Sequence, residues 1–142
     1  MTFSLHPDFD GGSAFVADLK LSQVRLHLDA RFPWLILIPR VDAVRDLDDL
    51  DADHRAMLMD EIVRASAAVR ALGEAWGRPV EKTNVAALGN VTPQLHVHVI
   101  GRRADDEAWP KPVWGQGAPR AYDASRRLQS LETLRRALAP SS

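Results

Sequence analysis

The chain has 142 residues, 46% of them hydrophobic, with 18 Lys and Arg against 19 Asp and Glu and no Cys. This length and hydrophobic content fit one globular domain and exclude a disordered chain. The absence of Cys excludes disulfide scaffolds, cysteine-ligated zinc and a thiolate nucleophile, and a net charge of −1 argues against a protein that binds nucleic-acid backbones.

Three short strands are expected in the first part of the chain, at residues 15–19, 23–28 and 34–38. Each is rich in Val, Leu and Ile and is bounded by polar or turn residues. Pro39 ends the third strand because proline has no N–H to donate to a ladder. The longest apolar run lies in this third strand and is far too short to cross a bilayer, and the first residues lack the pattern of a signal peptide. We therefore expect a cytoplasmic protein that does not bind membranes.

One long amphipathic helix is expected between residues 51 and 76. Its apolar side chains recur at spacings of three and four, which places them on one stripe. The members of this stripe are Leu58, Ile62, Ala65, Val69, Leu72 and Trp76. Asp51 or Asp53 is the expected N-cap, and Gly73 or Gly77 the expected end. The opposite face is expected to be solvated. Its charged residues are Asp60, Glu61, Arg64, Arg70 and Glu74.

Two further strands, at 83–88 and 94–102, are joined by a Gly-Asn-Val-Thr-Pro loop at 89–93. Together with the earlier elements they predict an α+β fold. We expect a mainly antiparallel sheet of about five strands with one long central helix and a C-terminal helix.

The C-terminal part begins with an irregular, proline-rich stretch at 104–121 that carries Trp109 and Trp114. A helix is expected from about residue 125. Its apolar stripe consists of Leu128, Leu131, Leu134 and Leu138. We expect residues 1–142 to form one domain, with a core at about 15–103 and an extension at about 104–142.

The stretch QLHVHVIGR, at residues 94–102, is the part of the sequence that carries chemistry. Side chains of a strand alternate between its two faces. The apolar side chains of this stretch are therefore expected to face the core, whereas Gln94, His96 and His98 form a polar row on the other face. Two imidazoles on one rigid strand suit phosphate chemistry or a metal.

Three interpretations of this pair of histidines remain open. The pair can be structural, with both imidazoles satisfied on a half-buried sheet. It can bind a metal, but the candidate third ligands show no supporting spacing. Those candidates are His27, Asp29, Asp105 and Asp106. The interpretation we favour is nucleophilic attack on a phosphoanhydride, because an imidazole with a pKa of about 6.5 is largely neutral at physiological pH.

QLHVHVIGR also resembles the signature of the histidine triad (HIT) family of nucleotide hydrolases and transferases, His-x-His-x-His followed by two apolar residues. The similarity extends over about residues 24–103, through the WLILIPR strand, the long helix and TNVAALGN. It implies hydrolysis or nucleotidyl transfer at a phosphoanhydride or phosphoramidate bond, for example of a dinucleoside polyphosphate. It also implies a homodimer with the long helix and a neighbouring strand near the two-fold axis. No cofactor is required, although Mg²⁺ can accompany a polyphosphate substrate.

The resemblance assigns catalytic roles to the two histidines of this stretch. His96 matches the middle histidine of the signature, which attacks the α-phosphate and forms a covalent nucleotidyl-histidine. His98 matches the third histidine, which contacts the phosphate.

Four further residues match positions that bind the nucleotide in the family. Asn84 matches an asparagine that helps to hold the phosphates or the ribose. Gly89 and Asn90 match a loop pair that faces the phosphate with backbone N–H groups and a side-chain amide. Asp29 matches an acidic residue that binds the ribose hydroxyls.

Three positions depart from the family pattern. The first histidine of the triad is Gln94, whose amide can bind phosphate but cannot exchange a proton near pH 7. Trp34 stands where many members have a further histidine, and Val91 replaces a hydroxyl residue, with Thr92 following it. An incomplete triad leaves an alternative function, a nucleotide-binding or sensing module with little or no turnover.

Overall fold

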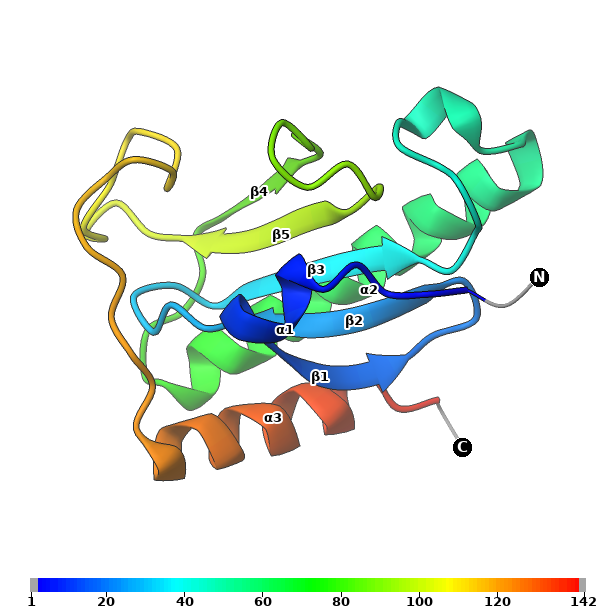
Figure 1. The fold of residues 1–142 in the computed structure, drawn as a ribbon. Coiled ribbons are helices and arrows are strands. Elements are labelled where there is room, and N and C mark those ends of the chain that lie inside the picture. The colour runs from blue at the N-terminus through cyan, green and yellow to red at the C-terminus, as the bar shows by residue number, and fades with distance from the viewer. Residues whose placement is uncertain (1–2, 141–142) are drawn as a thin grey trace.

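The computed structural model describes residues 3–140, and its main element is a five-stranded sheet (Figure 1). The strands follow the spatial order β1-β2-β3-β5-β4, and every neighbouring pair is antiparallel. They are β1 (Ser13–Asp18), β2 (Ser22–His27), β3 (Trp34–Pro39), β4 (Lys82–Ala86) and β5 (Val97–Arg102). The expected α+β fold with a five-stranded antiparallel sheet is confirmed, and β3 ends at Pro39 as predicted.

The helices include the two expected ones and two short elements that the sequence did not predict. They are α1 (Asp8–Gly12), the 3-10 helix η1 (Leu47–Asp49), α2 (Ala52–Ala75) and α3 (Ala124–Leu138). Figure 1 shows α2 on one side of the sheet and α1 on the other. No helix among residues 3–140 is both long and apolar enough to cross a membrane.

The ends of α2 follow from its capping residues. Asp51 is the N-cap, and its side chain accepts a hydrogen bond of 2.8 Å from the N–H of His54. Gly77 follows the helix with φ of +72°, a backbone conformation that is strained for a residue with a side chain. Gly73 lies inside the helix and does not end it. A Cβ at this position would come within 2.7 Å of the Arg78 carbonyl oxygen, which explains why the residue is glycine.

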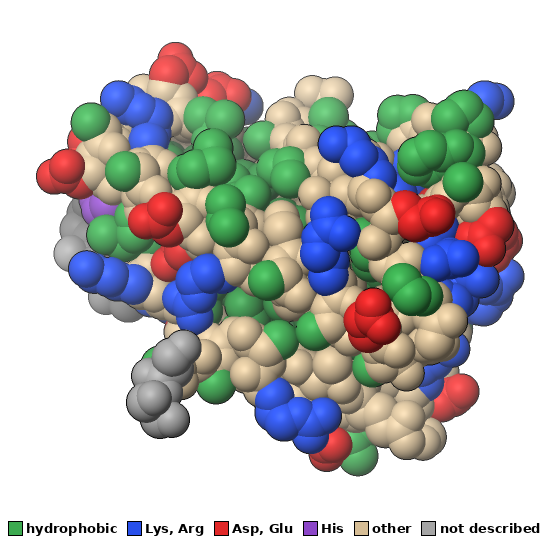
Figure 2. All heavy atoms as spheres, turned by 180° about the vertical axis from the view of Figure 1, so that it is seen from behind, with side chains coloured by type: hydrophobic (Ala, Val, Ile, Leu, Met, Phe, Trp, Pro, Cys, Tyr) green, Lys and Arg blue, Asp and Glu red, His purple; other side chains and the backbone are tan. Residues whose placement is uncertain are grey.

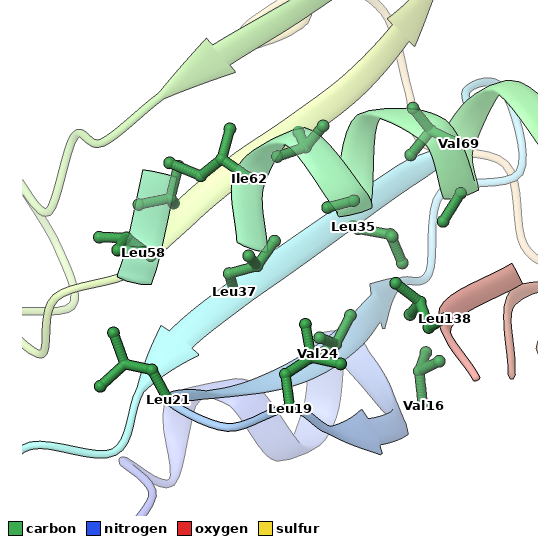
Figure 3. Close-up of a cluster of buried hydrophobic side chains, with 14 of the residues drawn as sticks. Val16, Leu19, Leu21, Val24, Leu35, Leu37, Leu58, Ile62, Val69 and Leu138 are labelled. Atoms are coloured by element: carbon green, nitrogen blue, oxygen red, sulfur yellow. The ribbon is translucent and has the colours of Figure 1, made fainter. Parts of the chain in front are cut away.

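The larger hydrophobic cluster lies between the sheet and α2 (Figure 3). Leu58, Ile62 and Val69 of the predicted stripe contact the sheet residues Leu35 and Leu37 across this layer. Leu134 and Leu138 of α3 belong to the same cluster. The prediction for Leu128 was wrong, since it is 57% exposed. The apolar stripe of α3 therefore reaches the core only in the C-terminal half of the helix.

Glu61 also corrects a prediction, because it is 3% exposed and not on the solvated face of α2. Its two carboxylate oxygens accept hydrogen bonds of 2.8 and 2.9 Å from the N–H groups of Leu21 and Ser22. These N–H groups lie where the turn between β1 and β2 leads into β2. Glu61 thus ties α2 to that turn.

A second, smaller cluster covers the opposite face of the sheet. It joins Phe9 of α1 to Trp34 and Ile36 of β3, to Ile100 of β5 and to Val113 of the 104–121 stretch. The sheet is therefore buried on both faces, which explains why all six residues of β3 are buried.

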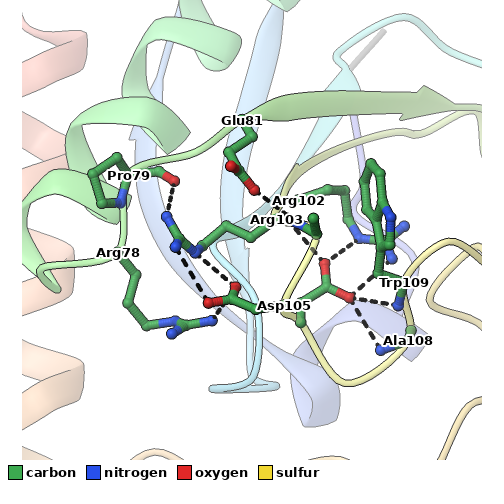
Figure 4. Close-up of polar contacts among 10 residues, drawn as sticks. Arg78, Pro79, Glu81, Arg102, Arg103, Asp105, Ala108 and Trp109 are labelled. Atoms are coloured by element: carbon green, nitrogen blue, oxygen red, sulfur yellow. Dashed lines mark hydrogen bonds and ion pairs between the residues drawn. The ribbon is translucent and has the colours of Figure 1, made fainter.

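Arg102 fastens the 104–121 stretch to the end of β5 (Figure 4). Its guanidinium donates to both carboxylate oxygens of Asp106, to the Asn84 side chain and to the Lys111 carbonyl. The Asp106 carboxylate in turn accepts from the N–H groups of Ala108 and Trp109. An irregular stretch thereby obtains a fixed path over the second face of the sheet.

Candidate active site

The histidine pair lies at the start of β5, on the face of the sheet opposite α2. β5 begins at Val97. Gln94 and His96 therefore precede the strand, although the sequence predicted that both belong to it. His96 and His98 are 8% and 7% exposed, and their ring centroids lie 5.0 Å apart. The two imidazoles are adjacent, as expected, although the polar row does not extend to the Gln94 side chain.

A backbone carbonyl determines the tautomer of His96. The Nδ1 atom of His96 lies 2.8 Å from the carbonyl oxygen of Gln94. Because a carbonyl oxygen can only accept, Nδ1 carries the hydrogen and Nε2 keeps its lone pair. The free lone pair of the neutral ring is therefore on Nε2.

An indole determines the opposite tautomer for His98. The Nε1–H group of Trp34 donates a hydrogen bond of 2.9 Å to Nδ1 of His98. Since the indole can only donate, Nδ1 of His98 is unprotonated and Nε2 carries the hydrogen. Burial lowers the pKa of His98 to about 3, with further contributions from the nearby His96 and His27. His98 is thus a neutral N–H donor at physiological pH.

Trp34 is a site residue that the sequence analysis identified only as a departure from the family pattern. Its ring lies against that of His27 at 3.9 Å between centroids, with the ring planes tilted by 35°, and meets the ring of Trp114 edge-to-face at 5.7 Å. Trp34 and Ile36 alternate with Leu35 along β3, and Ile36 pairs with His98. This alternation places Trp34 on the face of His98, which is the signal that could have found it.

A cleft of about 290 Å³ opens beside the histidine pair. It is lined by Leu88, Gly89, Asn90, Val91, Thr92, His96, His98 and Trp114. Gly89 has φ of +68°, a conformation that favours glycine, in the loop that leads from β4 to the start of β5. The structure therefore brings Gly89 and Asn90 together with both histidines.

A second cavity, of about 240 Å³, adjoins His96 on the side of η1. Arg45, Asp46 and Asp48 line it together with Leu88 and Gly89. His96 borders both cavities, so a molecule that reaches its ring has room on either side. Larger cavities of about 480 and 430 Å³ lie beside Trp76, at the end of α2, and no histidine lines them.

Asn84 and Asp29 do not line the cleft, because each has other partners. The side-chain oxygen of Asn84 accepts a hydrogen bond of 2.8 Å from Arg102. Asp29 is 2% exposed, forms a 2.8 Å ion pair with Arg31 and accepts from the N–H of Arg120. Burial alone would raise the pKa of Asp29, but these hydrogen bonds outweigh it and lower the pKa.

The side chain of Gln94 also lies outside the cleft. Its Oε1 accepts a hydrogen bond of 2.8 Å from the N–H of His6, and its Nε2 donates one of 2.9 Å to the carbonyl of Ser4. The amide is thus bound to the N-terminal part of the chain, which the sequence analysis connected to no site. Only the backbone carbonyl of Gln94 contacts the histidine pair.

Comparison with known families places this site in a wider context. The family model described as "HIT domain" matches residues 11–105. This chain belongs to the HIT family. The comparison with curated proteins found no match.

Solved structures of other HIT proteins superpose on nearly the whole chain. A histidine triad protein from Bradyrhizobium japonicum is 44% identical, with a TM-score of 0.89 and coverage of 98% of this chain and 100% of that one. A histidine triad protein from Sinorhizobium meliloti is 36% identical, with a TM-score of 0.87 and coverage of 96% and 98%. One from Marinobacter aquaeolei is 35% identical, with a TM-score of 0.85 and coverage of 97% of each chain.

Two parts of the site in this HIT protein lie outside the matched range. Trp114 enters the cleft from beyond residue 105, and the partners of the Gln94 side chain, Ser4 and His6, precede residue 11. Among residues 3–140, no group of three or more His, Asp or Glu side chains is arranged to hold a metal ion. The described site therefore consists of the imidazole pair, the 88–92 loop and the aromatic side chains around them.

Proposed function

We propose that this HIT protein is a nucleotide hydrolase or nucleotidyltransferase that acts on a phosphoanhydride or phosphoramidate bond through a covalent nucleotidyl-His96 intermediate. The observation that carries the proposal is the pair of opposite tautomers. His96 presents an unprotonated Nε2, whereas His98 presents a protonated Nε2. The centroids of the two rings lie 5.0 Å apart. A nucleophile and a hydrogen-bond donor thus face the same cleft.

The reaction has two steps, and its atoms balance without a further reagent. The lone pair of His96 Nε2 attacks the α-phosphorus, and the bond to the leaving group breaks with its electron pair on that group. Water, or the hydroxyl of another acceptor, then attacks the same phosphorus and releases its proton to solvent, and the P–N bond breaks with its electron pair on Nε2, which restores neutral His96. Mg²⁺ enters this scheme only as a companion of a polyphosphate substrate.

The other cleft residues stabilise the phosphate in this proposal. The Nε2–H of His98 donates to a phosphate oxygen, and the N–H groups and amide of Gly89 and Asn90 supply further donors from the loop. Leaving groups that depart as stable anions suit the site best, because the amide of Gln94 cannot protonate one. A dinucleoside polyphosphate is therefore the substrate we would test first.

The test is a panel of dinucleoside polyphosphates and nucleoside phosphoramidates, with release of nucleoside monophosphate as the signal. Acid-free mass spectrometry of the stopped reaction should show a nucleotidyl adduct on His96. The His96→Ala variant should release no product, while its far-UV circular dichroism stays that of the wild type. Equal product release by both proteins would refute the proposal.

A nucleotide-binding module with little turnover is the second candidate function. The observation that favours it is the engaged amide of Gln94, which leaves the position of the first triad histidine without a group in the cleft. Calorimetry would then show nucleotide binding with no product over hours. Rapid turnover would exclude it.

We also propose a homodimer built on the β4 edge and the outer face of α2. β4 is the last strand of the sheet, and Met59, Val63 and Val85 are 58%, 62% and 48% exposed. Seen from behind, apolar side chains gather in patches on this side of the molecule (Figure 2). An exposed strand edge beside apolar side chains is a surface that a second copy can cover.

A further inference from the structure

The N-terminal segment, which we define as residues 3–9, runs along the face of the sheet that carries the histidine pair (Figure 1). Phe3 and Leu5 pack against the smaller hydrophobic cluster, and Phe9 is part of it. The segment therefore has a fixed place beside the site.

Gln94 holds this segment as a neighbouring strand would. In an extended chain the carbonyl of one residue and the N–H of the second residue after it point to the same side. The side-chain amide of Gln94 forms a hydrogen bond with each of these groups, since it donates to the Ser4 carbonyl and accepts from the His6 N–H. An imidazole has one donor and one acceptor as well, but its two nitrogens point apart and match this spacing poorly.

A second hydrogen bond joins the segment to the cleft loop. The hydroxyl of Thr92 donates a bond of 2.8 Å to the carboxylate of Asp8, and Thr92 itself lines the cleft. The segment and the loop are thus connected at two points, Gln94 and Thr92.

The N-terminal segment ends in contact with His96, the proposed nucleophile. The ring of Phe9 meets the ring of His96 at 5.0 Å between centroids and at 77°, which is an edge-to-face contact. Phe9 is 6% exposed, so this contact is buried. His96 is thus contacted at Nδ1 by the carbonyl of Gln94 and on its ring by Phe9.

We infer that Gln94 is a positioning residue: its side chain binds the N-terminal segment over His96, and through Phe9 it orients the nucleophilic ring, without contacting the substrate. The effect on catalysis rests on the proposed function, whereas the effect on the segment and on His96 does not. Gln94 in this chain thus supports the histidine after it by both its backbone and its side chain.

The first test uses the full chain without nucleotide. Gln94→Met keeps the length of the side chain and removes both hydrogen bonds. Two bonds of about 1 kcal/mol each keep the segment closed, so amide exchange at residues 3–9 should become roughly 10- to 30-fold faster. Acylation of His96 by diethyl pyrocarbonate, which needs an unprotonated and accessible ring nitrogen, should also become severalfold faster.

The matched control is Gln129→Met, on the exposed side of α3, which should change neither rate. Acylation of His54, at the start of α2, serves as an internal reference in every sample. Thr92→Val, which removes the other connection, should shift both rates in the same direction by a smaller factor. Unchanged exchange at residues 3–9 and unchanged acylation of His96 in Gln94→Met would overturn the inference.

The second test distinguishes positioning from contact with the substrate. Gln94→Met and Phe9→Leu should each lower kcat about tenfold with little change in KM, and the double variant should be no slower than the slower single one. Multiplied effects, or a change confined to KM, would mean that Gln94 acts on the substrate directly and would also overturn the inference. If the wild type turns over no nucleotide, the proposed function fails, and the exchange and acylation rates still decide the role of Gln94.

Discussion

His96 and His98 carry their ring hydrogen on different nitrogens, and the difference comes from neighbouring groups that do not titrate. A carbonyl of Gln94 faces His96, and the indole of Trp34 faces His98. The QLHVHVIGR pattern predicted that both imidazoles would lie together, which the structure confirms. It could not predict the tautomer of His98, because Trp34 comes from a strand far away in the sequence.

Trp34→Phe is the variant that tests this arrangement. It removes the N–H that donates to His98 and leaves Nδ1 buried without a partner, so kcat should fall by about tenfold or more. The ¹⁵N chemical shifts of the His98 ring should also change from the Nε2–H pattern. Trp76→Phe is the control, because it removes the same group from a hydrogen bond with Ser130 away from the site. Equal losses in both variants would mean that Trp34 has only a structural role.

His98 also makes stability depend on pH in a defined direction. Its pKa is about 3 in the folded chain, against 6.5 when unfolded, so the unfolded state binds more protons between these values. The free energy of unfolding should therefore be highest above about pH 6.5 and fall as the pH decreases toward 3, and His27, whose pKa burial also lowers, adds to the same trend. Urea titrations from pH 7.5 to 4.5 measure the slope, which should be smaller in His98→Asn. An unchanged slope in that variant would contradict the assignment.

At the scale of elements, α2 shows what periodicity predicts and what it misses. The apolar stripe and the Asp51 cap are confirmed, because both depend on local spacing. Glu61 lies three residues after Leu58 and four before Ala65, so its spacing places it on the stripe. Its charge led us to place it on the solvated face. The hydrogen bonds that make its burial favourable come from the β1–β2 turn, which the helix sequence does not contain.

Glu61→Ala should lower the free energy of unfolding by about 1–3 kcal/mol, because two buried N–H groups lose their acceptor. Asp60→Ala, on the exposed side of the same helix, should change it by less than about 0.5 kcal/mol. Denaturant unfolding of both variants gives the comparison. If the two losses were the same, the bond to the β1–β2 turn would contribute nothing.

At the scale of the whole molecule, the α+β class and the five-stranded antiparallel sheet followed from the sequence, whereas the strand order and the partners of several polar residues did not. Asn84 and Asp29 were expected to bind the nucleotide. In the structure their side chains pair with Arg102 and Arg31. Arg102 is the last residue of the QLHVHVIGR stretch, and Arg31 lies outside it. Both also donate to backbone carbonyls of the 104–121 stretch, whose path no periodic pattern describes.

The proposed dimer is tested by charge placed on its surface. Val63→Glu puts a carboxylate on the exposed face of α2, where Val63 is 62% exposed, and should turn a dimer into a monomer in light scattering after size exclusion. Leu128→Glu, at an exposed apolar position on α3, is the control and should leave the mass unchanged. A wild-type monomer at micromolar concentration would refute the proposal.

Arg102 has a consequence for how the cleft can vary between relatives. β5 carries His98 near its beginning and Arg102 at its end, and Arg102 holds the stretch that brings Trp114 back to His98. His98 and the Trp114 wall of the cleft are therefore joined by a stretch of chain that Arg102 closes into a loop. Substitutions within residues 107–114 can change the shape of the wall while the loop stays anchored at the same strand. The wall of the cleft can therefore differ in shape while the histidine pair keeps its place.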